Sequence, residues 1–383
     1  MSKKRDILIT ALFCGFVGIM AIGTAFLPKE TVSVNEKRTL ALFPELSAEK
    51  LINGKWERGF ESYISDHFPM RNLFTSIDSY YLFYSGRNGS KGVYKGKDGY
   101  LINAPVKYDK DILNKNMSAV MDFARNTKIT TKVLIVPSAG YIMSDKLPDV
   151  HTQYHDGNIL DDINQECADT VEFIDISQEF IRNREDKQLY YKTDHHWTSE
   201  GAYLAYKLWA ENEGIAVREK QDYSIEKTDG FFGTTYTKSA LWNEKPDAIE
   251  IWEYPINVSV LVEDSLGDKQ QDGMFFKEYD RMFFKEHLEE QDKYPVFFDG
   301  NHGFERIINN DNSDGRKILV VKDSYAHSFV PFMAENCSQI DMVDLRYYMD
   351  SVSQLTEGNN YDEVLIIYGM SNLCEANDLA MLE

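Results

Sequence analysis

The chain has 383 residues, of which 43% are hydrophobic, and its formal net charge at pH 7 is −21. This length and apolar content suffice for one large domain or two ordinary ones, each with a substantial core. The acidic balance argues against nucleic acid, and against an anionic membrane surface, as a partner of the folded part. Four cysteines, Cys14, Cys167, Cys337 and Cys374, form no CxxC pair, which argues against a zinc module or a disulfide scaffold and leaves one bridge open.

The first 30 residues predict a membrane anchor or a signal segment. Lys3-Lys4-Arg5 precedes an uncharged, largely apolar run over residues 7–27. About 20 such residues can cross a bilayer, and the positive charges before them place the rest of the chain outside the cytoplasm. A cleaved signal peptide is the competing interpretation, because Gly23-Thr24-Ala25 offers small residues near a cleavage point. The length of the run favours a retained span, and on either interpretation the folded body is extracytoplasmic, anchored or secreted.

Residues 31–105 predict an irregular segment that packs on the main domain, with helical pieces and glycine-rich turns. Residues 106–383 then alternate helix-like stretches with short, continuous apolar runs. This alternation predicts a mostly parallel sheet covered on both faces, that is, a three-layer α/β/α sandwich. Residues 220–310 interrupt it with segments typical of antiparallel strands, which we interpret as a β-rich insertion. The predicted strands of the sandwich are 132–136, 172–176, 317–321, 340–345 and 364–368, and the predicted helices are 109–126, 199–213, 325–335 and 351–355.

The stretch Asp194-His195-His196-Trp197 places three polar side chains just before a predicted helix that Thr198 caps and Gly214 ends. If the stretch is extended, Asp194 and His196 point to one side and His195 to the other. A carboxylate bonded to one ring nitrogen of His196 would leave the other nitrogen as a general base. This arrangement requires a nucleophile from another part of the chain.

Ser324 is the candidate nucleophile, because the strand predicted over residues 317–321 runs through Lys322-Asp323-Ser324-Tyr325 into a helix. Ligands bind open α/β sheets at the carboxyl ends of parallel strands, and backbone N–H groups at a helix start can stabilise an oxyanion. The alternative is that Asp323 or Ser324 only caps the helix, which is the commonest use of these residues there.

The two motifs together resemble the DHHW family. Asp194-His195-His196-Trp197 matches the motif that names the family, and Lys322-Asp323-Ser324-Tyr325 resembles its later Asp-Ser block, with a lysine where many SGNH proteins have glycine. Phe232-Gly233-Thr234 and other short matches extend the resemblance over nearly the whole chain. The family is similar to the SGNH hydrolase-like proteins and to the alginate O-acetylation proteins, and its motifs stand in permuted order.

The resemblance implies Ser324 as nucleophile, His196 as general base and Asp194 as the carboxylate that orients it. Arg346, Tyr368, His195 and Tyr325 become candidates for binding substrate or stabilising the oxyanion. For Arg346 a surface salt bridge, and for Tyr368 a place at the edge of the core, are the structural alternatives. Catalysis of this kind requires neither a metal nor another cofactor.

The resemblance therefore implies an extracytoplasmic serine-dependent O-acetyltransferase or esterase that acts on a cell-surface or exported polysaccharide, with a membrane-bound O-acyltransferase as a partner. One alternative is a metal site built from Asp194, His195, His196, His302 or His327, although adjacent histidines lack the spacing of the better metal motifs. A second alternative is a non-catalytic glycan-binding protein with a degenerate SGNH site, since aromatic residues make up 13% of the chain.

Overall fold

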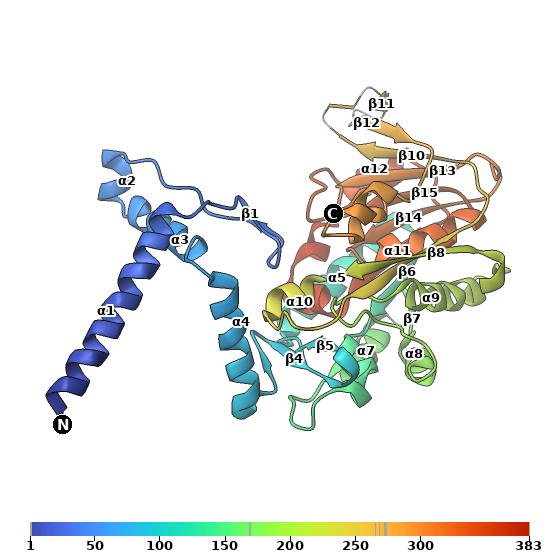
Figure 1. Cartoon of the computed structure of the whole chain (residues 1–383). Helices are drawn as coiled ribbons and strands as arrows, with labels where there is room; N and C mark the ends of the chain where they lie inside the picture. The colour runs from blue at the N-terminus through green and yellow to red at the C-terminus, as the bar shows by residue number, and fades with distance from the viewer. Residues whose placement is uncertain (1, 168–169, 265, 268, 272–273, 383) are drawn as a thin grey trace. The chain divides into compact units, whose positions relative to one another are not determined.

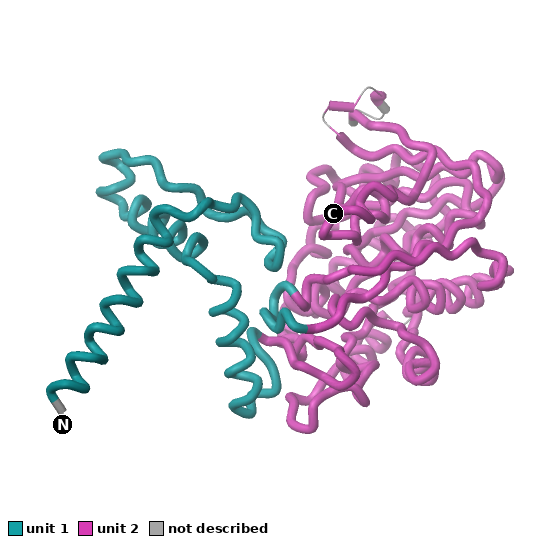
Figure 2. Tube along the Cα trace, in the orientation of Figure 1, with its two compact units in different colours: residues 1–91, 237–243 teal, residues 92–236, 244–383 magenta. Residues whose placement is uncertain are grey.

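The computed structural model of this protein describes residues 2–382 except 168–169, 265, 268 and 272–273. The chain divides into two compact units, which Figure 2 draws in different colours. Unit 1 comprises residues 1–91 and 237–243, and unit 2 comprises residues 92–236 and 244–383. All of the site residues proposed from the sequence lie in unit 2.

Unit 1 contains the apolar N-terminal segment, which forms one helix, α1. The stretch Lys3–Phe26 is long and apolar enough to cross a membrane, and it suits an anchor as well as a signal sequence. Helices α2 and α3 bury no residue, and α4 buries only Ser79. The elements of this unit include α1 (Ser2–Phe26), β1 (Val32–Ser33), β2 (Arg38–Thr39), α2 (Ala48–Ile52), α3 (Lys55–Asp66) and α4 (Arg71–Leu82).

Unit 2 has a mixed α/β fold around a nine-stranded sheet with the strand order β11-β12-β10-β13-β15-β14-β16-β6-β7 (Figure 1). The neighbours from β15 to β7 are parallel, and those from β11 to β15 are antiparallel. The strands are β6 (Thr130–Val136), β7 (Glu172–Ile174), β10 (Val258–Glu263), β11 (Lys269–Gln271), β12 (Met274–Tyr279), β13 (Phe304–Asn309), β14 (Arg316–Lys322), β15 (Cys337–Val343) and β16 (Glu363–Gly369).

The side chains of the central strands alternate between two apolar cores on opposite faces of the sheet. On β6, Leu134 and Val136 belong to one core, whereas Val133 and Ile135 belong to the other. Because both faces are buried, these strands are continuous apolar runs in the sequence. The first core contains residues of α8 (Ser177–Asn183), α9 (Ser199–Asn212) and α11 (Ala326–Met333); the second contains residues of α5 (Lys110–Thr127), α7 (Asp156–Cys167), α12 (Val352–Gly358) and α13 (Met370–Glu375).

Helix α9 begins and ends where the sequence indicates. The side-chain oxygen of Thr198 accepts a hydrogen bond from the backbone N–H of Gly201, which caps the first turn. Gly214 follows the helix with a φ of +66°, a conformation that favours glycine.

Residues 220–310 are rich in strands, as expected, but most of these strands belong to the central sheet. Strands β8 (Ser224–Phe231) and β9 (Asp247–Glu253) form a separate antiparallel pair. Strand β10 pairs with β13, and β13 pairs with β15, so the antiparallel strands extend the parallel ones. All four cysteines are free thiols in the structure, so the bridge that the sequence left open does not form.

Candidate active site

Ser324 lies in the turn between β14 and α11, at the carboxyl end of a parallel strand. The turn is shaped by Asp323, which accepts hydrogen bonds from the backbone N–H groups of Tyr325 at 3.0 Å and of Gly369 at 2.7 Å. Gly369 ends the neighbouring strand β16, so one buried carboxylate joins two strand ends. The Ser324 side chain caps no helix: it is half-buried and its oxygen lies 2.7 Å from a histidine nitrogen.

The DHHW stretch forms a closed, bent loop before α9. The backbone N–H of Tyr191 donates to the carbonyl of His196 at 3.2 Å, and the carboxylate of Asp247 accepts from the backbone N–H groups of Lys192 and Thr193 at 3.0 and 2.7 Å. Because the loop is bent, its side chains do not alternate as they would in an extended segment. His195 therefore lies beside its neighbours rather than on the opposite side.

His196 bridges Asp194 and Ser324. Its Nδ1 lies 2.5 Å from Oδ1 of Asp194, and its Nε2 lies 2.7 Å from Oγ of Ser324, which is 128 residues further along the chain. A carboxylate only accepts hydrogen bonds, so Nδ1 carries the proton and Nε2 accepts the proton of the serine hydroxyl. The structure thus brings together the three residues that the sequence singled out, with the Asp194 and His196 side chains buried.

The second oxygen of Asp194 is held by Thr234, the first residue of α10 (Thr234–Ser239). Both the backbone N–H and the hydroxyl of Thr234 donate to Oδ2, at 2.6 and 2.8 Å. Burial raises the pKa of Asp194, but electrostatic interactions with His196 and His195 and the hydrogen bonds from His196 outweigh it and hold this pKa well below its usual value. Asp194 is therefore an ionised, fully bonded carboxylate.

His195 is fixed by the same threonine. Its Nδ1 lies 2.6 Å from the hydroxyl oxygen of Thr234, and its ring centre lies 3.9 Å from that of His196. Since the one hydroxyl proton of Thr234 is given to Asp194, Nδ1 of His195 must donate to Thr234, which makes Nε2 the acceptor nitrogen of this ring. The side chain is 34% exposed, so it borders the site on the solvent side.

Two large side chains clamp the loop to the Ser324 turn. The indole N–H of Trp197 donates to the carbonyl of Tyr325 at 3.1 Å and to the hydroxyl of Ser328 at 2.8 Å. In return the hydroxyl of Tyr325 donates to the carbonyl of His195 at 2.7 Å. Trp197, the fourth residue of the motif, thus has a structural role, because it fixes the first turn of α11 against the histidine loop.

Tyr294 covers the other side of the general-base candidate. Its ring stacks on that of His196 with centroids 4.1 Å apart and an angle of 12° between the planes. Its hydroxyl donates to the backbone carbonyl of Ser324 at 3.0 Å. Tyr294 therefore holds both the base and the turn that carries the candidate nucleophile.

The backbone N–H groups at the start of α11 are already used. Those of Tyr325, Ala326 and His327 bond to oxygens of Asp323 and Ser324. Among the described residues, nothing accepts a hydrogen bond from the N–H of Ser324 itself. The group that can serve an oxyanion at this turn is thus the amide of Ser324, rather than the helix-start amides that we expected.

Arg346 and Tyr368 lie near the turn without bonding to Ser324 in the described structure. Arg346 forms a bidentate ion pair with the buried Asp344, at 2.8 and 2.6 Å, and its charge acts on Asp323. The hydroxyl of Tyr368 is buried and has no hydrogen-bond partner among the described residues. Burial raises its pKa well above the usual value, so the phenol remains neutral.

A buried charged cluster lies directly behind the turn. Nζ of Lys322 is 2.5 Å from Nε2 of His327 and 3.6 Å from carboxylate oxygens of both Glu305 and Asp344. The lysine, the glutamate and Asp344 are each 0% exposed. Burial raises the pKa of Glu305 to about 8, although the charge of Lys322 opposes this shift. Burial and the charge of Lys322 together lower the pKa of His327.

Asp194, His195 and His196 are the one group of three metal-ligand residues found among the described residues, with donor atoms within 4.8 Å of one another. The oxygens of Asp194 already accept four hydrogen bonds, and Nε2 of His196 bonds to Ser324. His327 is bonded to Lys322 instead. A metal ion would therefore have to displace the contacts that assemble the site.

A family model described as "DHHW protein" matches residues 98–343, which include the histidine loop, Thr234, Tyr294 and Ser324. The chain belongs to the DHHW family. A structural comparison finds a DHHW family protein from Eubacterium siraeum DSM 15702, with 22% identity and a TM-score of 0.64, over 76% of this chain and 95% of that one.

Two further relatives are similar to this DHHW protein. A solved structure of Bacillus cereus PatB1 with a sulfonyl adduct has 22% sequence identity and a TM-score of 0.63. The match covers 76% of this chain and 100% of that one. A probable alginate O-acetylase, AlgJ of Pseudomonas fluorescens, is 28% identical over 174 residues, which are 42% of this chain and 43% of that protein. The DHHW chain thus spans less than half of this curated relative.

Sequence reasoning assigned no role to Thr234, Tyr294 or Asp247, which hold the DHHW loop and the serine turn. Gly233 and Thr234 belong to a short match with the family, which marks them as functional candidates. The match does not indicate that Thr234 bonds to Asp194. Tyr294 and Asp247 had no local signal, because their contacts come from segments 30 to 55 residues away in the chain.

Proposed function

We propose that this DHHW-family protein is an extracytoplasmic, membrane-anchored SGNH-like enzyme that adds or removes O-acyl groups, with acetyl the expected group, on a cell-surface or exported polysaccharide. The observation that carries the proposal is the position of His196, with Nδ1 2.5 Å from Asp194 and Nε2 2.7 Å from the hydroxyl of Ser324. Serine is a weak nucleophile until a base takes its proton, and this geometry supplies the base and the group that orients it.

In the first half-reaction, Oγ of Ser324 attacks the carbonyl carbon of the acyl donor while its proton passes to Nε2 of His196. The C–O bond to the donor then breaks, and His196 gives the proton to the leaving oxygen. The product is an acyl-serine ester. Asp194 stabilises the imidazolium that forms between the two proton transfers, and the N–H of Ser324 donates to the oxyanion.

In the second half-reaction, a hydroxyl group takes the place of the donor. Nε2 of His196 accepts the proton of that hydroxyl as its oxygen attacks the acyl-serine carbonyl, and then returns the proton to Oγ of Ser324. A sugar hydroxyl gives a new ester, whereas water gives a free acid. Transferase and esterase differ in this acceptor alone, so the residues that hold the acceptor decide the reaction.

Four side chains around the Ser324 turn, two of them partly exposed and two buried, are the proposed binders of donor and acceptor. The His195 side chain is partly exposed, and Arg346 is held in place by its ion pair with Asp344. Tyr325 and Tyr368 are buried neutral phenols, and of the two only the Tyr368 hydroxyl has no hydrogen-bond partner among the described residues.

The similarity to proteins named alginate O-acetylase supports acetyl transfer to a polysaccharide as the activity class. Helix α1 supports membrane anchoring with the site outside the cytoplasm. We propose a membrane-bound O-acyltransferase as the partner that delivers the acyl group. A three-layer α/β/α sandwich of SGNH type with permuted motif order, the domain limits near residues 30 and 105, and the absence of any cofactor belong to the same proposal.

The test is covalent labelling of the full-length protein in detergent with a fluorophosphonate and, in parallel, with a sulfonyl fluoride. Peptide mass spectrometry should locate the adduct on Ser324, and His196→Ala should abolish it. Ser371→Ala, which removes an exposed serine, is the matched control and should label like the wild type.

Failure to label Ser324 under conditions that modify a known serine esterase would contradict the nucleophile assignment. A Ser324→Ala variant that still binds an acetylated oligosaccharide and retains the cellular phenotype would favour the glycan-binding alternative. Acetyl release from a chromogenic ester without transfer to any sugar would favour the esterase.

A further inference from the structure

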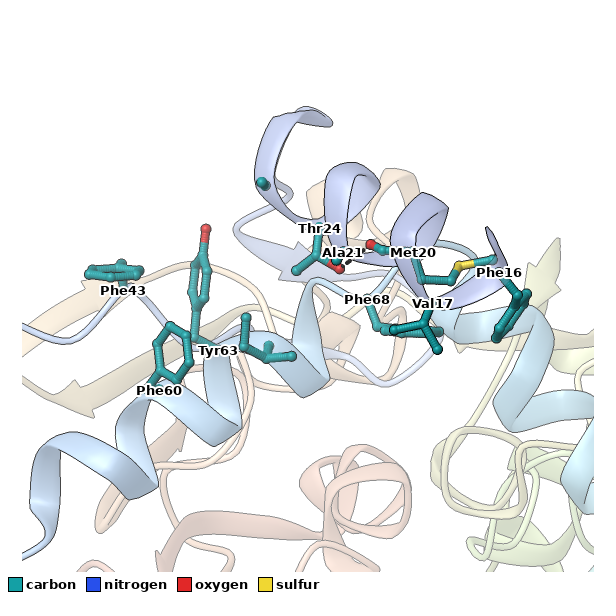
Figure 3. A pocket seen from close by; sticks show the side chains of 11 residues that line it. Phe16, Val17, Met20, Ala21, Thr24, Phe43, Phe60, Tyr63 and Phe68 are labelled. Atoms are coloured by element: carbon teal, nitrogen blue, oxygen red, sulfur yellow. Dashed lines mark hydrogen bonds between the residues drawn. The ribbon is translucent and has the colours of Figure 1, made fainter. Parts of the chain in front are cut away.

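Unit 1 contains a cavity of about 550 Å³ between α1 and α3 (Figure 3). Helix α1 lines it with Phe16, Val17 and Met20, and α3 lines it with Phe60, Tyr63 and Ile64. Its size falls within the roughly 300 to 1,000 Å³ of pockets that enclose small ligands. The lining is almost entirely aromatic and aliphatic, so an occupant must be apolar where it lies in the cavity.

The helices around this cavity lack a core of their own. Neither α2 nor α3 buries a residue, and α4 buries only Ser79. Nearby apolar side chains are strongly exposed, with Leu42 at 75%, Leu46 at 70% and Ile52 at 88%. An amphipathic helix in water normally buries its apolar stripe against protein. The apolar side chains before α3 therefore lack a protein core to pack against, and those of α3 itself are only half-buried.

The α1 wall of the cavity indicates that the surrounding of these apolar side chains is a membrane. Phe16, Val17, Met20 and Ala21 belong to the candidate membrane span Lys3–Phe26, and they lie in its second half. If the positive N-terminus stays in the cytoplasm, this half lies in the outer leaflet. In that orientation the α1 wall of the cavity lies at the depth of the hydrocarbon layer, and α3, which forms the opposite wall, lies beside the anchor.

The positively charged side chain of Lys29 lies just after α1, next to the cavity. Nζ of Lys29 donates to the carbonyl of Thr24, which also lines the cavity. In the part of the chain that the structure describes, no carboxylate forms an ion pair with Lys29. Its position, just beyond the last turn of the span, is the depth at which lipid phosphates lie, so its charge suits a phosphate group.

We propose that this cavity binds an acyl chain of an outer-leaflet phospholipid, with Lys29 at the headgroup phosphate. The binding site fixes α3 at the membrane surface. It goes beyond the proposed catalytic function and rests only on the anchor part of it, because α1 must remain on the mature protein.

The first experiment is native mass spectrometry of the full-length protein in detergent with palmitoyl-oleoyl phosphatidylglycerol. The wild type should retain one lipid. Ala21→Trp, which fills the cavity from α1, should lose it, whereas Ile22→Trp, the next residue on the same helix but outside the lining, should retain it. Lys29→Gln should remove the preference for phosphatidylglycerol over a diacylglycerol without a phosphate.

The second experiment measures where α3 lies in lipid nanodiscs. Spin labels are attached to Ile64→Cys, which lines the cavity, and to Glu61→Cys, which is exposed on the same helix, in a Cys14→Ser background. The label at 64 should collide with oxygen more than with a water-soluble nickel complex, and the label at 61 should show the reverse.

The proposal would be overturned if the nickel complex reached both positions equally, or if both tryptophan variants lost the lipid equally. An intact protein mass that lacks α1 would also overturn it. A label at 64 that neither reagent reaches would overturn it in favour of a protein partner. Labelling of Ser324 in the same preparation reports on the catalytic proposal separately, so the two can fail independently.

Discussion

Gly233 and Asp194 are so close that a Cβ atom at position 233 would lie 2.1 Å from the Cβ of Asp194 and 2.3 Å from its Oδ2. Real side chains do not approach to such distances, so only glycine fits beside this carboxylate. The residue before Thr234 thus determines where the carboxylate that orients His196 can lie.

Gly233→Ala should displace Asp194 and, through it, His196. A misplacement of about 1 Å at a catalytic group can lower the rate on the order of 10²-fold, and we expect kcat/KM to fall by this amount. Gly358→Ala is the control, because a Cβ there meets nothing within 4 Å. Steady-state hydrolysis of an activated acetyl ester measures both, and equal activity of the two variants would contradict the role of this contact.

Asp194→Asn should keep the shape of the site while removing the charge. An amide can present N–H to Nδ1 of His196 and so favour the tautomer in which Nε2 carries the proton. That tautomer cannot accept the proton of Ser324, so kcat should fall by about 10⁴-fold. Thermal unfolding distinguishes this from loss of fold, and a variant that retains more than a tenth of the wild-type kcat would argue against a base at position 196.

Trp197→Phe should loosen the turn that carries Ser324, because the indole N–H bonds to the Tyr325 carbonyl and the Ser328 hydroxyl. We expect a loss of about 1 to 3 kcal/mol in the free energy of unfolding and a lower kcat in the folded fraction. Trp209→Phe also loses a buried hydrogen bond, to Glu363, but away from the site. It should be destabilised while its kcat remains that of the wild type.

The Glu305 carboxyl should make stability depend on pH. Its pKa is raised from 4.5 to about 8 by burial, with the charge of Lys322 opposing this and those of Asp344 and Asp299 adding to it. Between these two values the folded state holds a proton that the unfolded state has released. The free energy of unfolding therefore falls as pH rises through this window and is unaffected by this group below it.

Glu305→Gln should remove that slope, because the amide does not titrate. Urea unfolding at several pH values across the window measures the slope for both proteins. The same slope in wild type and variant would assign the pH dependence to another group.

Activity should survive dialysis against EDTA. The oxygens of Asp194 and the Nε2 of His196 are engaged with Thr234, His196 itself and Ser324, so the site requires no ion to hold it together. Loss of activity that added zinc restores would instead support the metal-site alternative.

The parallel strands at the centre of the fold could be predicted from the sequence, because strands buried on both faces are continuous apolar runs. The strand predicted over residues 317–321 corresponds to β14 (Arg316–Lys322), and that over residues 364–368 to β16 (Glu363–Gly369). Continuous apolar runs of this kind are a local signal. The pairing of β10 with β13 and of β13 with β15 is not local, so the extension of the sheet by antiparallel strands could not be seen.

The candidate site divides in the same way. Asp194, His196 and Ser324 stand in short motifs that the family resemblance points to, and their catalytic roles stay predictions. Thr234 and Tyr294 act through contacts with residues 40 and 30 positions away, and nothing in their own segments indicates the partner. The assumption of an extended histidine loop was wrong, because the bonds of Asp247 to Lys192 and Thr193 bend it.

The nine-stranded sheet ends in two strands of three residues each, β11 (Lys269–Gln271) and β7 (Glu172–Ile174). A sheet edge is a template on which a strand from another molecule can grow, and a long, flat edge invites fibrous aggregation. Here each border exposes too few backbone groups to recruit a second chain. Both edges of this large sheet are therefore poor templates for polymerisation.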